Sequence, residues 1–146
     1  MLDAGLELRT VADTFQLEIV TPSRLLVKDA AEEAQIPGLS GYLGILPGHA
    51  PLLTELGVGA ITYKAHGATH TLSLAWGFAE VLPDKVTILA EAAERPQEID
   101  VARAQKAKDR AEQLLKSNDP KVEVDYARAE DALQRAETRL SVAKEK

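Results

Sequence analysis

Several residue types are scarce or missing, and each absence narrows what the chain can do. The 146 residues include no cysteine, which excludes a disulfide framework and thiol chemistry. No apolar run approaches the roughly 20 residues of a membrane-spanning helix, and the first residues lack the basic-then-apolar order of a secretory signal. With 45% hydrophobic and 27% charged residues, the composition is typical of one or two small globular domains, which we expect in the cytoplasm.

Basic residues are scarce in the first two thirds of the chain. Residues 1–97 contain 6 Lys and Arg against 12 Asp and Glu, whereas residues 98–146 contain 11 of each kind. The net charge of −6 therefore comes from the first part. Because an acidic surface repels polyanions, we expect no nucleic acid partner.

Glycine is absent after Gly77, and beyond Pro96 only Pro120 interrupts the chain. Up to about residue 95, the sequence consists of short apolar segments that are typical of strands and are separated by turn formers. These strands are expected at residues 15–20, 24–29, 32–37, 42–46, 59–66, 69–76, 77–82 and 85–92. Many short strands at this spacing predict a β-sandwich or a β-barrel.

The stretch from Pro37 to Leu53 interrupts regular structure most often, with four glycines, three prolines and His49. A phosphate cradle requires a helix after its glycines, and Pro47 and Pro51 would break that helix. His49 is expected to bond the loop backbone rather than a metal. We therefore interpret the stretch as a set of β-corners shaped to meet a partner.

Two helices are predicted after this part, over residues 99–117 and 124–144. Asp100 and Asp125 are the expected N-caps, because their side chains can accept hydrogen bonds from free backbone N–H groups. The short break between the helices predicts an antiparallel hairpin. Its expected seam consists of Ala104, Ala107, Ala111, Leu114, Ala129, Leu133, Ala136, Leu140 and Ala143. Since each buried methyl contributes only about 0.8 kcal/mol, we expect a marginal hairpin that can open.

Four arginines are expected along one edge of that hairpin. Arg103 and Arg110 are two turns apart on the first helix, and Arg135 and Arg139 are one turn apart on the second. One interpretation is that all four are solvated surface residues. The other is a bound polyphosphate, which would relieve the repulsion between them because guanidinium groups bind phosphate oxygens in pairs.

Neither catalysis nor a metal site is indicated elsewhere. The spacing of His66 and His70 suits a metal only on a helix, and Gly67 with the surrounding strand pattern excludes a helix there. No Ser/His/Asp arrangement and no pair of carboxylates stands out. The sequence therefore favours a binding role over an enzyme.

Three segments closely resemble the ε subunit of bacterial F-type ATP synthases: GYLGILPGHAPLLTELGVGAI, GFAEV and KVTILAEAAERPQEID. The resemblance runs from about Phe15 to the end, which leaves residues 1–14 as an N-terminal extension. It implies a β-sandwich over residues 15–97 followed by an antiparallel two-helix hairpin over residues 98–146. It also implies a non-catalytic rotor subunit at the cytoplasmic face of the bacterial membrane. The sandwich would dock on the γ subunit and the c-ring, and the hairpin, when extended, would reach the α/β head and block ATP hydrolysis.

In some bacterial members of this family, ATP is a regulatory ligand that stabilises the folded hairpin through an Ile/Leu-Asp-x-x-Arg-Ala motif. This chain has the motif as IDVARA. The resemblance implies that acidic and apolar residues surround the adenosine while the arginines hold the phosphates. The implied ATP-binding residues are Glu94, Ile99, Asp100, Arg103, Ala104, Arg110, Arg135 and Arg139.

Two residues depart from the family pattern. Tyr42 stands where an acidic residue often precedes Leu-Gly, so contacts with the c-ring would rely on its ring and hydroxyl, with His49 nearby. Trp76 replaces a frequent glycine. Two alternatives stay open beside an ATP-sensing rotor subunit. One is the same subunit with a hairpin that does not sense ATP, and the other is an independent enzyme, against which the missing catalytic residues argue.

Overall fold

The computed structural model describes residues 13–146, so the predicted N-terminal extension, residues 1–14, lies outside the described residues except for its last two. The first part consists of seven strands: β1 (Phe15–Thr21), β2 (Arg24–Ala31), β3 (Glu33–Gly38), β4 (Gly41–Ile45), β5 (Leu52–Ala65), β6 (Ala68–Val81) and β7 (Lys85–Glu94). They pair in the order β2-β1-β7-β6-β5-β3-β4. The β1–β7 pair is parallel and the other described pairs are antiparallel.

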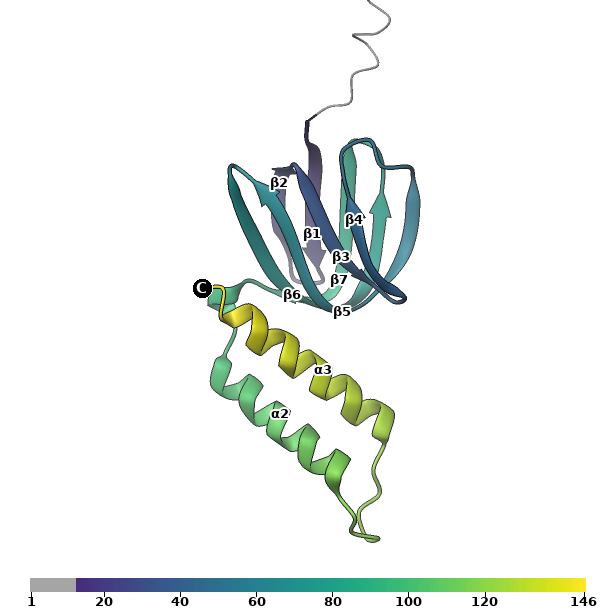
Figure 1. Ribbon diagram of the computed structural model, residues 1–146, viewed down its shortest axis with the longest axis vertical. Coiled ribbons are helices and arrows are strands. Elements are labelled where there is room, and N and C mark those ends of the chain that lie inside the picture. Colours follow the sequence, from purple (N-terminus) through teal and green to yellow (C-terminus); the bar gives the residue numbers. More distant parts are fainter. Residues whose placement is uncertain (1–12) are drawn as a thin grey trace, which may run out of the picture.

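The strands curl around one hydrophobic core and form the predicted β-sandwich (Figure 1). The core takes alternate residues from each strand, because successive side chains of a strand point to opposite faces. Its largest fully buried members include Phe15, Leu17, Ile19, Ile36, Leu56, Ile61, Tyr63, Leu72 and Ile88. Each such side chain contributes roughly 1.5–3 kcal/mol, so the sandwich holds most of the stabilising burial.

The prediction of separate strands at residues 69–76 and 77–82 is wrong, because both belong to the single strand β6. The strand continues through a distortion at Trp76 and Gly77, which both have positive φ angles, 62° and 142°. The distortion reverses which residues face the core: Leu72 and Leu74 are buried before it, and Ala79 and Val81 after it. Trp76 therefore occupies a backbone conformation that glycine adopts without strain.

Gly77 lies at a close backbone contact. A Cβ atom at this position would lie 2.1 Å from the carbonyl oxygen of Leu89 on β7. We expect Gly77→Ala to lower the free energy of unfolding by about 2–3 kcal/mol. The new methyl group would push β6 away from β7, and alanine would be strained at this φ angle, so both effects destabilise the folded state. Urea denaturation measures the change. Gly44→Ala is the matched control, because its Cβ would meet nothing within 4 Å, and an equal loss in both variants would contradict this account.

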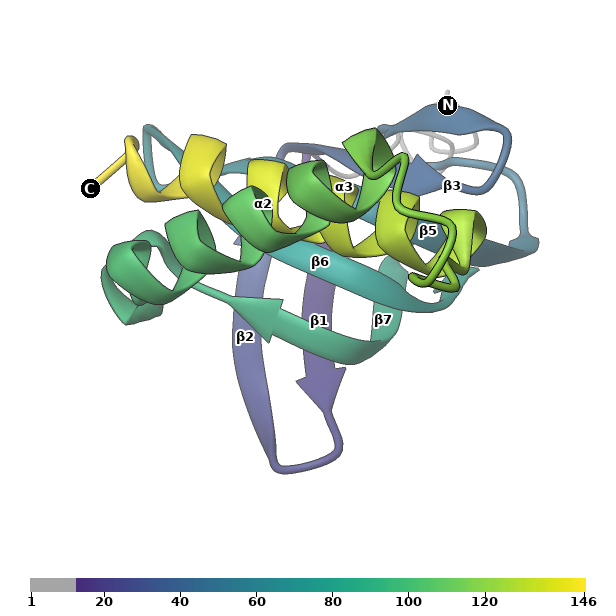
Figure 2. The same ribbon diagram turned by 90° about the horizontal axis from the view of Figure 1, so that it is seen from below.

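The second part is the predicted antiparallel hairpin of α2 (Val101–Lys116) and α3 (Tyr126–Ala143). Asp100 and Asp125 cap the two helices as expected, each accepting a hydrogen bond at 3.1 Å from the backbone N–H three residues on. α3 contacts β5 and β6, and α2 lies farther from the strands (Figures 1 and 2). Within residues 13–146, neither helix is long and apolar enough to cross a membrane.

The joint between sandwich and hairpin is the short helix η1 (Pro96–Glu98). The Glu98 carboxylate accepts a hydrogen bond from the backbone N–H of Arg95 at 2.9 Å and forms an ion pair with Arg24 of β2. The Arg95 guanidinium donates to the Leu26 carbonyl oxygen at 2.7 Å. These contacts fix the direction in which the chain leaves the sheet.

The pKa of Glu98 lies below its ordinary value of 4.5, chiefly because of the hydrogen bond from Arg24 and then that from the Arg95 backbone. A lowered pKa adds stability that is present above pH 4.5 and is lost as the pH falls below it. We therefore expect the difference in unfolding free energy between the native protein and Glu98→Gln to be constant near neutral pH. The difference should shrink on acidification. Denaturation at several pH values measures it, and a difference that does not vary with pH would contradict the assignment.

Candidate functional site

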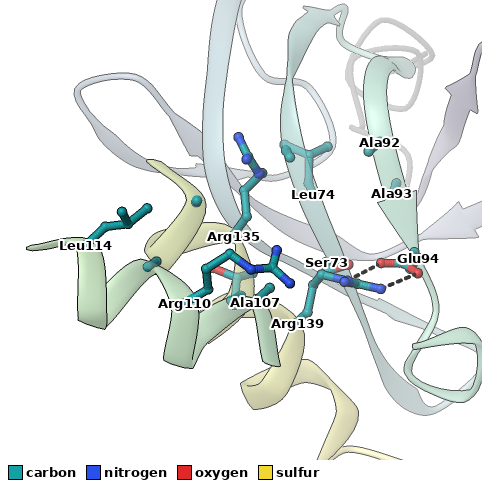
Figure 3. Close-up of a pocket in the computed structure, with 15 residues that line it drawn as sticks. Ser73, Leu74, Ala92, Ala93, Glu94, Ala107, Arg110, Leu114, Arg135 and Arg139 are labelled. Carbon is teal, nitrogen blue, oxygen red and sulfur yellow. Dashed lines mark hydrogen bonds and ion pairs between the residues drawn. The ribbon is translucent and has the colours of Figure 1, made fainter. Parts of the chain in front are cut away.

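A cavity of about 380 Å³ lies between the helical hairpin and the sheet. Both helices and strands β6 and β7 contribute to its wall, so it is assembled from parts far apart in the sequence (Figure 3). The lining residues are Ser73, Leu74, Ala75, Ala92, Ala93, Glu94, Ala107, Arg110, Ala111, Leu114, Ala132, Arg135, Ala136, Thr138 and Arg139. The volume falls in the range of small-molecule binding sites.

Three of the four predicted arginines converge on this cavity. Arg110 comes from α2, and Arg135 and Arg139 come from α3. The guanidinium of Arg139 binds the carboxylate of Glu94 through two hydrogen bonds, Nε to Oε1 at 2.7 Å and Nη2 to Oε2 at 3.2 Å (Figure 3). Among the described residues, Arg110 and Arg135 have no ion-pair partner.

The lining therefore carries a surplus of two positive charges beside walls of alanine and leucine. Guanidinium groups that gather without enough carboxylates favour an anion, and phosphate oxygens suit their paired N–H groups. The small apolar side chains of the lining leave room for a flat ring to pack against them. The arrangement can hold a ligand with an anionic end and a less polar end, and the binding of ATP there stays a prediction.

The remaining predicted residues lie outside the cavity lining. Arg103 is exposed two turns before Arg110. Asp100 is occupied as the N-cap of α2. Ile99 packs with Val142 and Ala143 at the end of α3, and Ala104 is fully buried. Of the four arginines expected along one edge, three thus line the cavity. The other motif residues build the start of the hairpin.

The alanine seam forms between the helices much as predicted. Ala104 and Ala111 are buried on α2, as are Ala129, Ala136 and Ala143 on α3. Four predicted seam residues differ. Leu114 and Ala107 line the cavity, and Leu133 and Leu140 are only half-buried. A seam of methyl groups contributes little burial, so a marginal hairpin stays a prediction.

Tyr42 and His49, the predicted partner contacts, both bond within the protein. The Tyr42 hydroxyl accepts a hydrogen bond from the backbone N–H of Ala60 at 3.1 Å, although the residue is 54% exposed. His49 Nδ1 lies 2.7 Å from the Ala50 carbonyl oxygen, which is the loop bond expected for it. Residues 13–146 contain no cluster of three or more side chains able to hold a metal.

An exposed apolar row crosses four strands and is not evident from the sequence. Leu25 pairs with Val20, Val20 with Leu89, and Leu89 with Phe78. We call these four residues the apolar row. Leu25, Leu89 and Phe78 are each 52–54% exposed. Large apolar side chains that adjoin one another on a surface mark a protein contact, unlike isolated ones.

Two family models match the chain. The model of the β-sandwich domain of the ATP synthase delta/epsilon chain matches residues 14–96. The model of the long α-helix domain of the same chain matches residues 97–144. Together they account for both structural parts.

Individual relatives agree with the family models. The ATP synthase epsilon chain of Koribacter versatilis is 74% identical over 106 residues, which cover 73% of this chain and 75% of the relative. That of Nitratidesulfovibrio vulgaris is 50% identical over 102 residues, which cover 70% and 76%. A solved chain in the OSCP/F1/c-ring assembly of Euglena gracilis mitochondrial ATP synthase has the same fold, with a TM-score of 0.77 at 22% identity over 99% of this chain and 96% of that one.

Proposed function

The chain belongs to the ATP synthase delta/epsilon family, and we propose that it is the ε subunit in the central stalk of a bacterial F-type enzyme, which couples proton flow to ATP synthesis. Its relatives carry the name of this non-catalytic subunit. The similar solved chain comes from an assembly that contains the c-ring. The proposed partners are the γ subunit, the c-ring and, with the hairpin extended, the α/β head. The subunit would lie at the cytoplasmic face of the membrane.

The apolar row is the surface that we assign to the γ subunit. Its side chains lie on the outer face of β2, β1, β7 and β6, where the core does not use them. Burying large apolar side chains favours association, because it removes apolar surface from water. The β-corners around Tyr42 and His49 would meet the c-ring.

The cavity is the proposed site of regulatory ATP. The observation that carries this proposal is the convergence of Arg110, Arg135 and Arg139 on one cavity with a single carboxylate among them. Arg110 belongs to α2 and the other two to α3, so the site is complete only when the hairpin is closed. A ligand that binds only the closed form stabilises it, by about 2.7 kcal/mol at a concentration 100 times its dissociation constant.

The hairpin would control ATP hydrolysis by moving between a closed position on the sandwich and an extended position in the α/β head. At high ATP the closed hairpin would stay on the sandwich and leave hydrolysis free. As ATP falls, repulsion between Arg110 and Arg135 would favour opening, and the extended hairpin would enter the α/β head and inhibit hydrolysis. The ion pair with Glu94 neutralises Arg139 and leaves the charges of Arg110 and Arg135 unbalanced.

Titration of the purified chain with ATP by calorimetry tests the regulatory proposal. We expect saturable binding at or below millimolar ATP, and parallel titrations with and without Mg²⁺ show whether the metal takes part. No saturable binding at millimolar ATP would favour the alternative, in which the hairpin inhibits without sensing ATP. The rotor assignment would then stand on the family relationship.

A further inference from the structure

The ladder between β3 and β5 is interrupted. Pairing stops at Gln35 opposite Thr62 and resumes only at Gly38 opposite Leu56. Two residues of β3 therefore face five residues of β5, which we call the gap segment (residues 57–61). Pro37 provides a cause, because it has no N–H to donate to a neighbouring strand. The other edge of the gap segment pairs with β6, but its backbone groups that face β3 must find hydrogen-bond partners elsewhere.

Two side chains from other elements supply those partners. The backbone N–H of Ala60 donates to the Tyr42 hydroxyl on β4 at 3.1 Å. The Val58 carbonyl oxygen accepts from the side-chain amide of Gln134 on α3 at 3.2 Å. Residues two apart in a strand present their backbone groups to the same edge, so both bonds fill the edge that β3 leaves open.

Packing joins the same elements. A Cβ atom at Gly59 would lie 2.5 Å from the Tyr42 hydroxyl, so glycine is what lets the tyrosine approach. Ala60, which Tyr42 bonds, packs against a small cluster at the end of the hairpin, formed by Ile99, Val142 and Ala143. The gap segment thus contacts both Tyr42, at the start of β4 beside the β3–β4 turn, and the closed helical hairpin.

We infer that Tyr42 is a positioning residue for hairpin closure. It holds the gap segment in the shape that Gln134 and the last turn of α3 bind, and so couples the β3–β4 turn to the closed hairpin. Such coupling is reciprocal: whatever fixes the turn favours closure, and closure fixes the turn. The idea that the c-ring fixes the turn rests on the proposed function. The coupling itself requires no ATP.

Hydrogen exchange on the full chain without ATP tests this inference. In Tyr42→Phe the Ala60 N–H loses its partner, and we expect amides of α3 to exchange about 5-fold faster while those of β1 and β7 keep their rates. Gly59→Ala, which displaces the tyrosine, should act in the same direction. Tyr126→Phe is the matched control, since its exposed hydroxyl forms no hydrogen bond within residues 13–146.

A double-mutant cycle with Gln134→Ala separates coupling from general weakening. Gln134→Ala should speed exchange at residues 39–43, which form the β3–β4 turn and the start of β4. In that background, Tyr42→Phe should speed exchange in α3 by less than about a further 2-fold. The inference is overturned by additive effects, by α3 rates that match those of Tyr126→Phe, or by equal acceleration in β1 and α3. None of these outcomes depends on whether ATP binds, so failure here is distinct from failure of the proposed nucleotide site.

Discussion

Replacing Arg110 and Arg135 together with alanine should weaken ATP binding by at least about 100-fold. Each guanidinium lines the cavity without an ion-pair partner among the described residues, so both are free to bind phosphate oxygens. A hydrogen bond to a charged group contributes roughly 1.5–3 kcal/mol, and two such losses exceed the 2.7 kcal/mol that corresponds to 100-fold. Calorimetric titration of the double variant measures the change.

The control for this experiment is Arg128→Ala. Arg128 is exposed on the same α3 helix but does not line the cavity, so its loss changes net charge without changing the site. We expect the control to keep native affinity and the double variant to keep its assembly with γ. Equal weakening in both would mean that ATP responds to net charge alone. Lost assembly would mean that these arginines face the rotor.

Replacing Phe78 and Leu89 together with glutamate should weaken association with the γ subunit by more than about 100-fold. The two residues are direct cross-strand partners at the centre of the exposed side of β6 and β7, each about half exposed. Docking would bury both new carboxylates without a counter-charge, and each uncompensated burial costs several kcal/mol. Binding to purified γ is the measurement.

Val122→Glu serves as the matched control, since Val122 is also partly exposed and apolar but lies in the link between α2 and α3. It should bind γ as the native protein does. The double variant should still fold, because its residues are not part of the core, and should unfold at a somewhat lower temperature, because the opposed glutamates repel each other and Glu55. If the folded double variant binds γ as tightly as the native protein does, the apolar row is not part of the γ interface.

Local chemistry predicted the parts of this molecule that depend on neighbours in sequence. Asp100 and Asp125 cap their helices because a capping side chain acts on backbone three residues away. The hairpin and its alanine seam follow from periodicity and a short break. Three of the four arginines line one cavity, whereas Arg103, two turns earlier on α2, does not. Helical phasing places side chains around a helix but does not indicate where along the helix a cavity against the sheet begins.

Features set by distant pairing were not predictable in this way. The apolar row joins Leu25, Val20, Leu89 and Phe78 from four strands, and only the parallel β1–β7 pair brings its halves together. The outward position of Phe78 beside inward Ala79 was the available signal. The sequence predicts a boundary between two strands at Trp76 and Gly77, because a glycine within a strand pattern does not show whether the strand ends there or continues through a bulge. The roles of Tyr42 and Gln134 depend on a gap that appears only once β3 and β5 are aligned.

Hydrogen exchange with and without saturating ATP tests most directly whether the closed hairpin is a nucleotide-binding form. Amides of α2 and α3 and the end of β7 near Glu94 are predicted to exchange at least 10-fold more slowly with ATP, while those in β1 and β2 stay unchanged. Unaltered hairpin rates at an ATP concentration that saturates calorimetric binding would contradict the account, because ATP would then bind without stabilising closure.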